Sequence, residues 1–153
     1  MKYIQLTQNY VAFVDDEDYE RVNTQKWRAL RKGTNCWSVI TGKWTVTPLA
    51  NFIMGDPPTG FIWDHVNRND FDNQRSNLRL ATTSQNGMNR TMNYNNTSGY
   101  PGVRYYKSRD RWKADIGANG ERIYLGFFKT KEEAIRARKV AELTYFGDFA
   151  PKV

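Results

Sequence analysis

A polar segment at residues 91–98 divides the chain more clearly than any other feature of the sequence. It has the sequence Thr-Met-Asn-Tyr-Asn-Asn-Thr-Ser and shows no hydrophobic periodicity, which is typical of a linker. A chain of 153 residues has room for one ordinary domain or two small ones. We therefore expect two domains, at residues 1–90 and 99–153, joined by residues 91–98.

Short strand-like runs dominate residues 1–60. Residues 3–7 and 10–14 flank a Gln8-Asn9 turn and predict a hairpin. Asp15 or Asp16 is expected to cap a short acidic helix that ends near Gln25. The other elements expected here are strands at residues 26–30, 36–41 and 43–47 and a helix at residues 49–54 that stops at Gly55. Residues 1–48 either support the segment that follows or add contacts to a polyanionic partner through the basic residues Arg28, Arg31 and Lys32.

The C-terminal segment has a different pattern. Residues 103–107, 112–117 and 122–126 alternate between apolar and polar, which predicts three antiparallel strands. Thr130 and Glu133 form a capping box at the start of a helix with small residues on one face, and Gly147 suits its C-terminal end. The expected fold class is α+β: a β-rich N-terminal part, then a three-stranded antiparallel sheet packed on one helix.

The charge of the chain favours a nucleic-acid partner. The net charge is +7, and residues 99–153 hold twelve Lys or Arg against seven Asp or Glu. Cys36 is the only cysteine, which excludes an internal disulfide and a thiolate zinc cluster. No apolar run approaches the roughly 20 residues that cross a membrane, and the N-terminus lacks a signal-peptide stretch. We expect a cytoplasmic protein without a membrane partner.

The single histidine, His65, follows Asp64 at the end of an expected strand, residues 61–65. A polar loop at residues 66–76 and a second strand at 77–81 come next, then a helix at 84–90 with Ser84 as its N-cap. Histidine titrates near neutral pH, so His65 is the candidate general base. Oxygen ligands from Asp64 and Asn86 suit Mg²⁺ or Mn²⁺, and Asn77 is placed to orient the imidazole. A lone histidine in a polar loop is usually just solvated, but the surrounding Asn and Arg residues favour chemistry here.

This region resembles the His-Asn-Asn variant of the HNH nucleases. The resemblance covers residues 53–90, and its motif runs Asp64-His65-Val66-Asn67-x-Asn69-x-x-Asp72-Asn73-x-Arg75-Ser76-Asn77-Leu78-Arg79-Leu80-Ala81-Thr82, then Gln85-Asn86. It implies a ββα-metal finger that hydrolyses phosphodiester bonds. In that finger His65 is the general base, Asp64 and Asn86 hold one divalent cation, and Asn77 positions the histidine or the substrate.

Two positions depart from the HNH pattern. Ala50 stands where relatives usually have histidine. Arg68 stands where relatives favour glycine. The arginine either restricts the φ angle that the loop can adopt at this position or adds a contact to a phosphate. Arg68 and Arg75 are both expected to contact DNA.

The C-terminal segment resembles the plant ethylene-response-factor (APETALA-type) DNA-binding domain. The matching stretches include Ser98-Gly99-Tyr100-Pro101-Gly102-Val103-Arg104, Trp112-Lys113-Ala114, Arg122-Ile123-Tyr124-Leu125-Gly126-Phe127-Phe128 and Tyr145-Phe146-Gly147. The resemblance implies DNA contacts from one sheet face. The residues on that face are Arg104, Tyr106, Lys113, Asp115, Arg122 and Tyr124. Pro101 and Gly117 replace arginines that this family often has, so the DNA contacts should be weaker or different.

Together these features predict a metal-dependent, site-preferring DNA endonuclease, a homing enzyme of phage or intron origin. One active site per chain favours a monomer that nicks double-stranded DNA, and a symmetric dimer stays open. The first alternative is a DNA-binding regulator with a relict HNH fold. The second is a protein whose sheets only mediate protein contacts.

Overall fold

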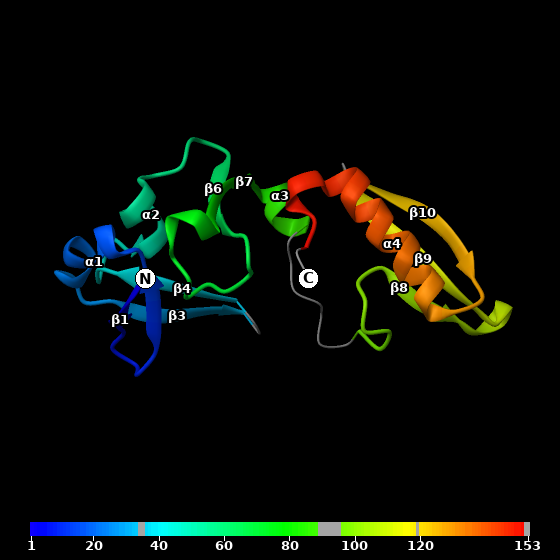
Figure 1. Cartoon of the computed structure of the whole chain (residues 1–153), viewed down its shortest axis with the longest axis horizontal. Coiled ribbons are helices and arrows are strands. Elements are labelled where there is room, and N and C mark those ends of the chain that lie inside the picture. The colour runs from blue at the N-terminus through cyan, green and yellow to red at the C-terminus, as the bar shows by residue number, and fades with distance from the viewer. Residues whose placement is uncertain (34–35, 89–95, 119, 152–153) are drawn as a thin grey trace. The chain divides into compact units, whose positions relative to one another are not determined.

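The computed structural model describes residues 1–33, 36–88, 96–118 and 120–151 (Figure 1). The chain divides into two compact units, Met1–Asn86 and Gly87–Val153. Of the expected linker, residues 91–95 lie outside the described part, so the linker stays a prediction. Helix and strand are mixed in both units, and no helix of the described part is long and apolar enough to cross a membrane.

The first unit is built from short strands around small helices. The N-terminal hairpin pairs β1 (Lys2–Gln5) with β2 (Val11–Val14), and α1 (Asp16–Asn23) follows. A second antiparallel sheet has the order β3-β4-β5, from β3 (Arg28–Gly33), β4 (Cys36–Thr41) and β5 (Thr47–Pro48). Next come α2 (Leu49–Met54), the antiparallel pair β6 (Phe61–His65) and β7 (Leu78–Thr82), and α3 (Thr83–Met88), which crosses the unit boundary.

The core of the first unit joins both of its N-terminal sheets to the helices. Trp27 is its largest fully buried side chain, and its indole N–H donates to the Val22 carbonyl at 2.8 Å. The other buried members are Ile4, Leu6, Ala12, Val14, Val22, Ala29, Val39, Leu49 and Ile53. Burial of these side chains is the main favourable term in folding this unit.

Several expected elements of this unit have other boundaries. The strand expected at residues 43–47 is wrong: only Thr47–Pro48 pairs with β4, and residues 42–46 form the connection. The helix after β7 begins at Thr83, so Ser84 lies inside it. A capping box closes that end, because the Gln85 N–H donates to the Thr82 hydroxyl and the Thr82 N–H donates to the Gln85 side chain. Residues 89–90 of the expected helix lie outside the described part.

The capping role expected of the aspartates before α1 also differs. Asp15 occupies the N-cap position but makes no capping hydrogen bond. Its carboxylate accepts instead from the Arg75 backbone N–H at 2.7 Å and from the Gln74 side chain at 3.1 Å. Asp15 thus ties α1 to the polar loop after β6.

The second unit is a three-stranded antiparallel sheet covered by one helix, as expected (Figure 1). Its strands are β8 (Val103–Tyr106), β9 (Arg111–Ala118) and β10 (Glu121–Phe128), in the order β10-β9-β8. The covering helix is α4 (Lys131–Phe146). The predicted capping box of Thr130 and Glu133 is confirmed, and Gly147 takes the C-cap with φ +52°.

Small side chains let α4 lie close on the sheet. Ala134 and Ala141 are buried against Val103, Ala114 and Ile116. A buried polar cluster accompanies them: Arg138 donates to Glu142 at 2.9 Å and to the Asp115 carbonyl at 2.7 Å, and Tyr100 donates to Glu142. This cluster fixes the centre of β9 against the helix.

Candidate active site and nucleic-acid interface

Strand β6 ends with Asp64 and His65, and β7 lies directly opposite. In the register of the pair, Asp64 faces Arg79 and His65 faces Leu78. Successive side chains of a strand point to opposite faces, so the carboxylate and the imidazole lie on different sides of the β6-β7 pair.

Asp64 is engaged by a cross-strand arginine. Its Oδ2 accepts from Nε of Arg79 at 2.8 Å and lies 2.8 Å from a terminal guanidinium nitrogen, and Asp64 is only 5% exposed. A buried carboxylate needs such compensation. The sequence identified Asp64 as a candidate metal ligand but did not predict its ion pair with Arg79.

The imidazole of His65 lies between two side chains of the polar loop. Its Nε2 is 3.2 Å from Oδ1 of Asn73, and its Nδ1 is 3.8 Å from Oδ1 of Asp70, too far for a hydrogen bond. The Asn73 amide donates its Nδ2–H to the Asp70 carbonyl, so Oδ1 is the atom that faces the ring. An oxygen acceptor there requires the ring proton on Nε2, which leaves the lone pair of neutral His65 on Nδ1.

The loop that carries these partners is anchored to the N-terminal sheets. The Asn73 N–H donates to the Phe13 carbonyl, and the Phe13 N–H donates to the Phe71 carbonyl, both at 2.8 Å. Oδ2 of Asp70 accepts from the Trp37 N–H at 2.7 Å. The open question about residues 1–48 is answered in part: β2 and β4 hold the loop that surrounds His65.

Asn77 organises this loop rather than the imidazole. Its Oδ1 accepts from the Asn67 N–H at 3.0 Å, and its Nδ2 donates to Oδ1 of Asn67 and to the Asp72 carbonyl. The Asn77 carbonyl accepts from the N–H of Val66, the residue after His65, at 2.9 Å. Asn77 therefore fixes the position of His65 through the backbone, and Asn73 contacts the ring.

Asn86 lies on α3, half-buried, and its side-chain amide makes no hydrogen bond among the described residues. Its carbonyl oxygen and the Asp64 carboxylate are the donor types that Mg²⁺ and Mn²⁺ prefer. Within the described ranges no group of three or more His, Cys, Asp or Glu residues could hold a metal, so any cation here would depend on these two side chains and on water or phosphate oxygens. These oxygen donors are of the type that binds a hard cation. The Asp64 carboxylate would then contact both the cation and Arg79.

The two arginines expected to contact DNA from the loop have different surroundings. Arg68 is exposed, and its φ of +62° is left-handed, which explains why glycine suits this position. Arg75 binds Asp18 with two hydrogen bonds, at 2.8 and 2.9 Å, and lies 2.8 Å from Glu17. These hydrogen bonds hold the pKa of Arg75 above its ordinary value. Arg75 therefore clamps the loop to α1.

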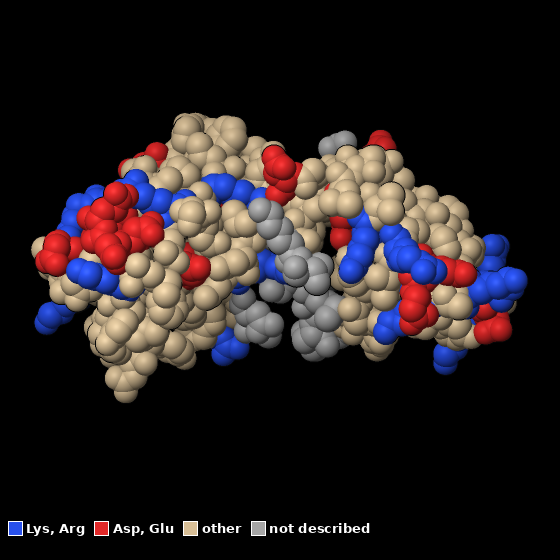
Figure 2. Space-filling model, in the orientation of Figure 1, with Lys and Arg blue, Asp and Glu red and all other residues tan. Residues whose placement is uncertain are grey.

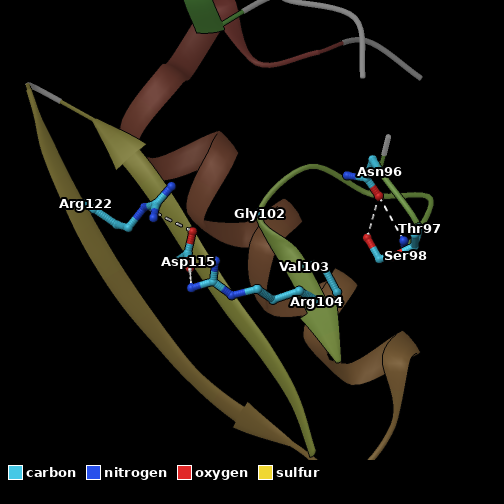
Figure 3. Close-up of a pocket in the computed structure, with 8 residues that line it drawn as sticks. All are labelled: Asn96, Thr97, Ser98, Gly102, Val103, Arg104, Asp115 and Arg122. Atoms are coloured by element: carbon cyan, nitrogen blue, oxygen red, sulfur yellow. Dashed lines mark hydrogen bonds and ion pairs between the residues drawn. The ribbon is translucent and has the colours of Figure 1, made fainter. Parts of the chain in front are cut away.

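The outer face of the C-terminal sheet holds an Arg-Asp-Arg cluster, formed by Arg104, Asp115 and Arg122 (Figure 3). Arg104 lies 3.2 Å from Oδ2 of Asp115, and Arg122 lies 3.5 Å from Oδ1. Both arginines are diagonal neighbours of Asp115, and Gly117 opposite Arg122 has no side chain in the way. A pocket of about 260 Å³ adjoins the cluster, lined also by Asn96, Thr97, Ser98, Gly102 and Val103.

Asp115 is not an open part of this face. It is 5% exposed, and its Oδ2 makes no hydrogen bond among the described residues although Arg104 is near. The buried carboxylate therefore forms ion pairs with both arginines, whose side chains are 52% and 70% exposed.

The remaining expected DNA contacts form an aromatic group beside this cluster. Tyr106 and Tyr124 are exposed, and both rings pack against Phe127, with centroids 5.5 and 5.6 Å away. The ammonium of Lys113 lies 5.4 Å from the Tyr124 ring centroid. Phe127 joins this face because a bulge between Tyr124 and Gly126 shifts the alternation of β10.

Sequence reasoning missed Asn73 and Asp70 as neighbours of the base. Both stand within the motif, eight and five residues after His65 respectively, but loop geometry decides which asparagine meets the ring. The high content of Asn and Asp in the loop was the sequence signal that could have pointed to these neighbours. Asn and Asp side chains form hydrogen bonds with the nearby backbone and so build rigid turns.

Comparisons with known proteins give a consistent result. Uncharacterized HNH endonuclease L560 of Acanthamoeba polyphaga mimivirus is 30% identical over 141 residues, which cover 91% of this chain and 72% of the viral protein. Protein 3.8 of Escherichia phage T7 is 34% identical over 67 residues, 44% of this chain and 55% of the phage protein. No family profile matches the chain, and no solved structure gives a significant match. The alignment to the mimivirus protein is longer than either unit, so it extends over both. The chain belongs to the HNH endonuclease family.

Proposed function

We propose that this protein is a metal-dependent endonuclease that hydrolyses phosphodiester bonds in double-stranded DNA. The single observation that carries the proposal is the placement of His65 at the end of β6, next in sequence to Asp64, with its Nε2 3.2 Å from Oδ1 of Asn73. A general base needs a defined lone pair at a nitrogen that titrates near neutral pH. The likeness to a protein named as an HNH endonuclease supports the same conclusion.

His65 accepts a proton from the attacking water at Nδ1 while Asn73 keeps the ring oriented. The hydroxide so formed attacks phosphorus, and the bond to the leaving 3′ oxygen breaks. A divalent cation held by Asp64 and Asn86 would stabilise the negative charge on the phosphate and on that oxygen. Asn77 contributes by fixing the backbone that follows His65.

The C-terminal unit supplies affinity and placement on DNA in this proposal. Arg104 and Arg122 are exposed on the outer face of the sheet, where their guanidinium groups are accessible to phosphates or guanine edges. The likeness of this unit to the ethylene-response-factor domain remains a prediction. With one active centre per chain, a monomer would nick one strand per event, as expected of a homing nuclease of phage or intron origin.

The test is a nicking assay on supercoiled plasmid with Mg²⁺ or Mn²⁺, comparing the wild type with His65→Ala. We expect relaxed circles from the wild type alone, and equal DNA binding by both proteins in EDTA. A matched control is Gln74→Ala, which changes a side chain of the same loop that bonds Asp15 and not the imidazole. Its nicking rate should stay near that of the wild type.

Two outcomes would contradict the proposal. Equal nicking by His65→Ala would remove the imidazole from the reaction. Binding without nicking in either metal would favour the DNA-binding regulator with a relict HNH fold.

A further inference from the structure

The basic residues of the first unit are segregated along the sequence. Residues 1–20 hold one lysine and five acidic residues, whereas residues 21–55 hold six Lys or Arg and no Asp or Glu. In Figure 2 the acidic side chains of this unit gather over α1. The β3-β4-β5 sheet and its connections therefore carry only basic charge. This is not evident from the net charge of residues 1–60, which is +1 from seven Lys or Arg and six Asp or Glu.

Three lysine and arginine residues lie near the β4-β5 end of this sheet. Arg28 pairs with Ile40 in the register of β3 and β4. The hydroxyl of Thr41, the last residue of β4, donates to the Lys26 carbonyl at 2.9 Å. Lys43 follows in the β4-β5 connection, and both lysines are exposed. Arg21, by contrast, is occupied by Asp18 and by the Phe52 carbonyl.

The connection from β4 to β5 is a tight turn with a tryptophan at its tip. Gly42 has φ +87°, and a Cβ there would lie 2.1 Å from the Thr45 carbonyl oxygen, so only glycine fits. Trp44 is 89% exposed, more than any other large apolar side chain of the described residues. The Lys43 ammonium lies 5.1 Å from its ring centroid, and the neighbouring Val46 is 48% exposed.

An indole left in water on a turn of fixed shape is a candidate contact surface. The choice of partner follows from the charge. A sheet with basic residues and no acidic ones suits the phosphates of a duplex, and an exposed aromatic ring beside a lysine suits the face or edge of a base. Apolar wedges of this kind enter the minor groove of bent DNA in other proteins.

We propose that the hairpin tip around Trp44, together with Lys26, Arg28 and Lys43, is a second DNA-contacting surface, in which the Trp44 ring packs against bases while the basic side chains neutralise phosphates. This inference rests on the proposed function and extends it, because the first unit would then bind the duplex directly and not only through the C-terminal unit. The sheet that carries the tip is the same one that anchors Asp70 through Trp37.

The experiment measures the dissociation constant for a fluorescein-labelled 30-base-pair duplex by anisotropy in EDTA, so that no DNA is cut. Trp44→Ala should weaken binding by about 5- to 100-fold, as expected for one lost base contact, and Trp44→Phe should recover part of it. Lys26→Ala with Lys43→Ala should lower the slope of log affinity against log salt by about 2. Tyr3→Ala, another exposed aromatic outside the basic segment, is the control and should bind as the wild type does.

Folding does not confuse this test, because Trp44 is exposed and its replacement should leave the thermal midpoint unchanged. Wild-type affinity in Trp44→Ala, with normal nicking by the wild type, would overturn the inference and leave the proposed function intact. Loss of a dimer in sedimentation, with DNA affinity unchanged, would overturn it in favour of a contact between two copies. Failure of the wild type to bind or nick DNA would overturn both proposals.

Discussion

The contact between Asn73 and His65 gives the sharpest prediction. Replacing Asn73 with alanine removes the acceptor that faces Nε2 of the ring, at 3.2 Å in the structure. Without that acceptor, neutral His65 no longer has a fixed tautomer. In part of the population the ring proton then lies on Nδ1, and a protonated Nδ1 cannot accept a proton from water. We expect Asn73→Ala to slow nicking and to leave DNA affinity in EDTA unchanged.

The size of the effect follows from the bond that is lost. A neutral hydrogen bond contributes about 0.5–1.5 kcal/mol, which corresponds to a rate reduction of about 2- to 13-fold. Removing the base itself in His65→Ala should cost about 10²- to 10⁴-fold. Asn73 is 2% exposed and also bonds the Asp70 carbonyl, so Asn73→Ala should lower the free energy of unfolding by about 1–3 kcal/mol.

Nitrogen NMR reads the tautomer directly. The chain has one histidine, so a long-range ¹H–¹⁵N spectrum of the protein shows one imidazole. The wild type should show a protonated Nε2 and an unprotonated Nδ1 at a pH where the ring is neutral, and Asn73→Ala should show a mixture. Asn73→Asp keeps an oxygen toward Nε2 and should keep the wild-type pattern. A proton on Nδ1 in the neutral wild type would refute the reasoning.

Three other predictions concern the charged residues. Arg68→Gly should raise the free energy of unfolding by up to about 1 kcal/mol, because Arg68 is held at φ +62°; a urea titration measures this, and a loss of stability would contradict it. Burial alone would raise the pKa of Asp18, but hydrogen bonds from Arg75 and Arg21 outweigh it and hold the pKa below 3.8. A lowered pKa means that Asp18 stabilises the fold above pH 3.8 and loses this contribution as the pH falls further. The free energy of unfolding should therefore fall less steeply with decreasing pH in Asp18→Asn than in the wild type. Parallel curves for the two proteins would show that Asp18 does not cause the acid destabilisation. Arg104→Ala with Arg122→Ala should lower the salt slope of DNA binding by about 2, while high protein concentration still gives nicks; unchanged binding would exclude this face as a DNA contact.

Local sequence patterns were sufficient to predict structure where the stabilising interactions join residues only a few positions apart. The capping box of Thr130 and Glu133 joins groups three residues apart, and the alternation of the C-terminal segment predicted its three strands. The α2 helix and the β6 strand also have their expected bounds. The same reasoning failed at residues 43–47, where alternation suggested a strand but the tight turn at Gly42 keeps most of them out of the sheet.

The amino-acid sequence was enough to predict most of the helices and strands and to identify Asp64, His65, Asn77 and Asn86 as candidate site residues. The groups that surround these four residues became known only from the three-dimensional packing of the chain. Arg75 reaches Asp18 across 57 positions of the chain, Trp37 bonds Asp70 across 33, and Asp115 is covered by arginines from two other strands. Such contacts depend on how separate elements pack, and no short-range rule of spacing or propensity contains that information.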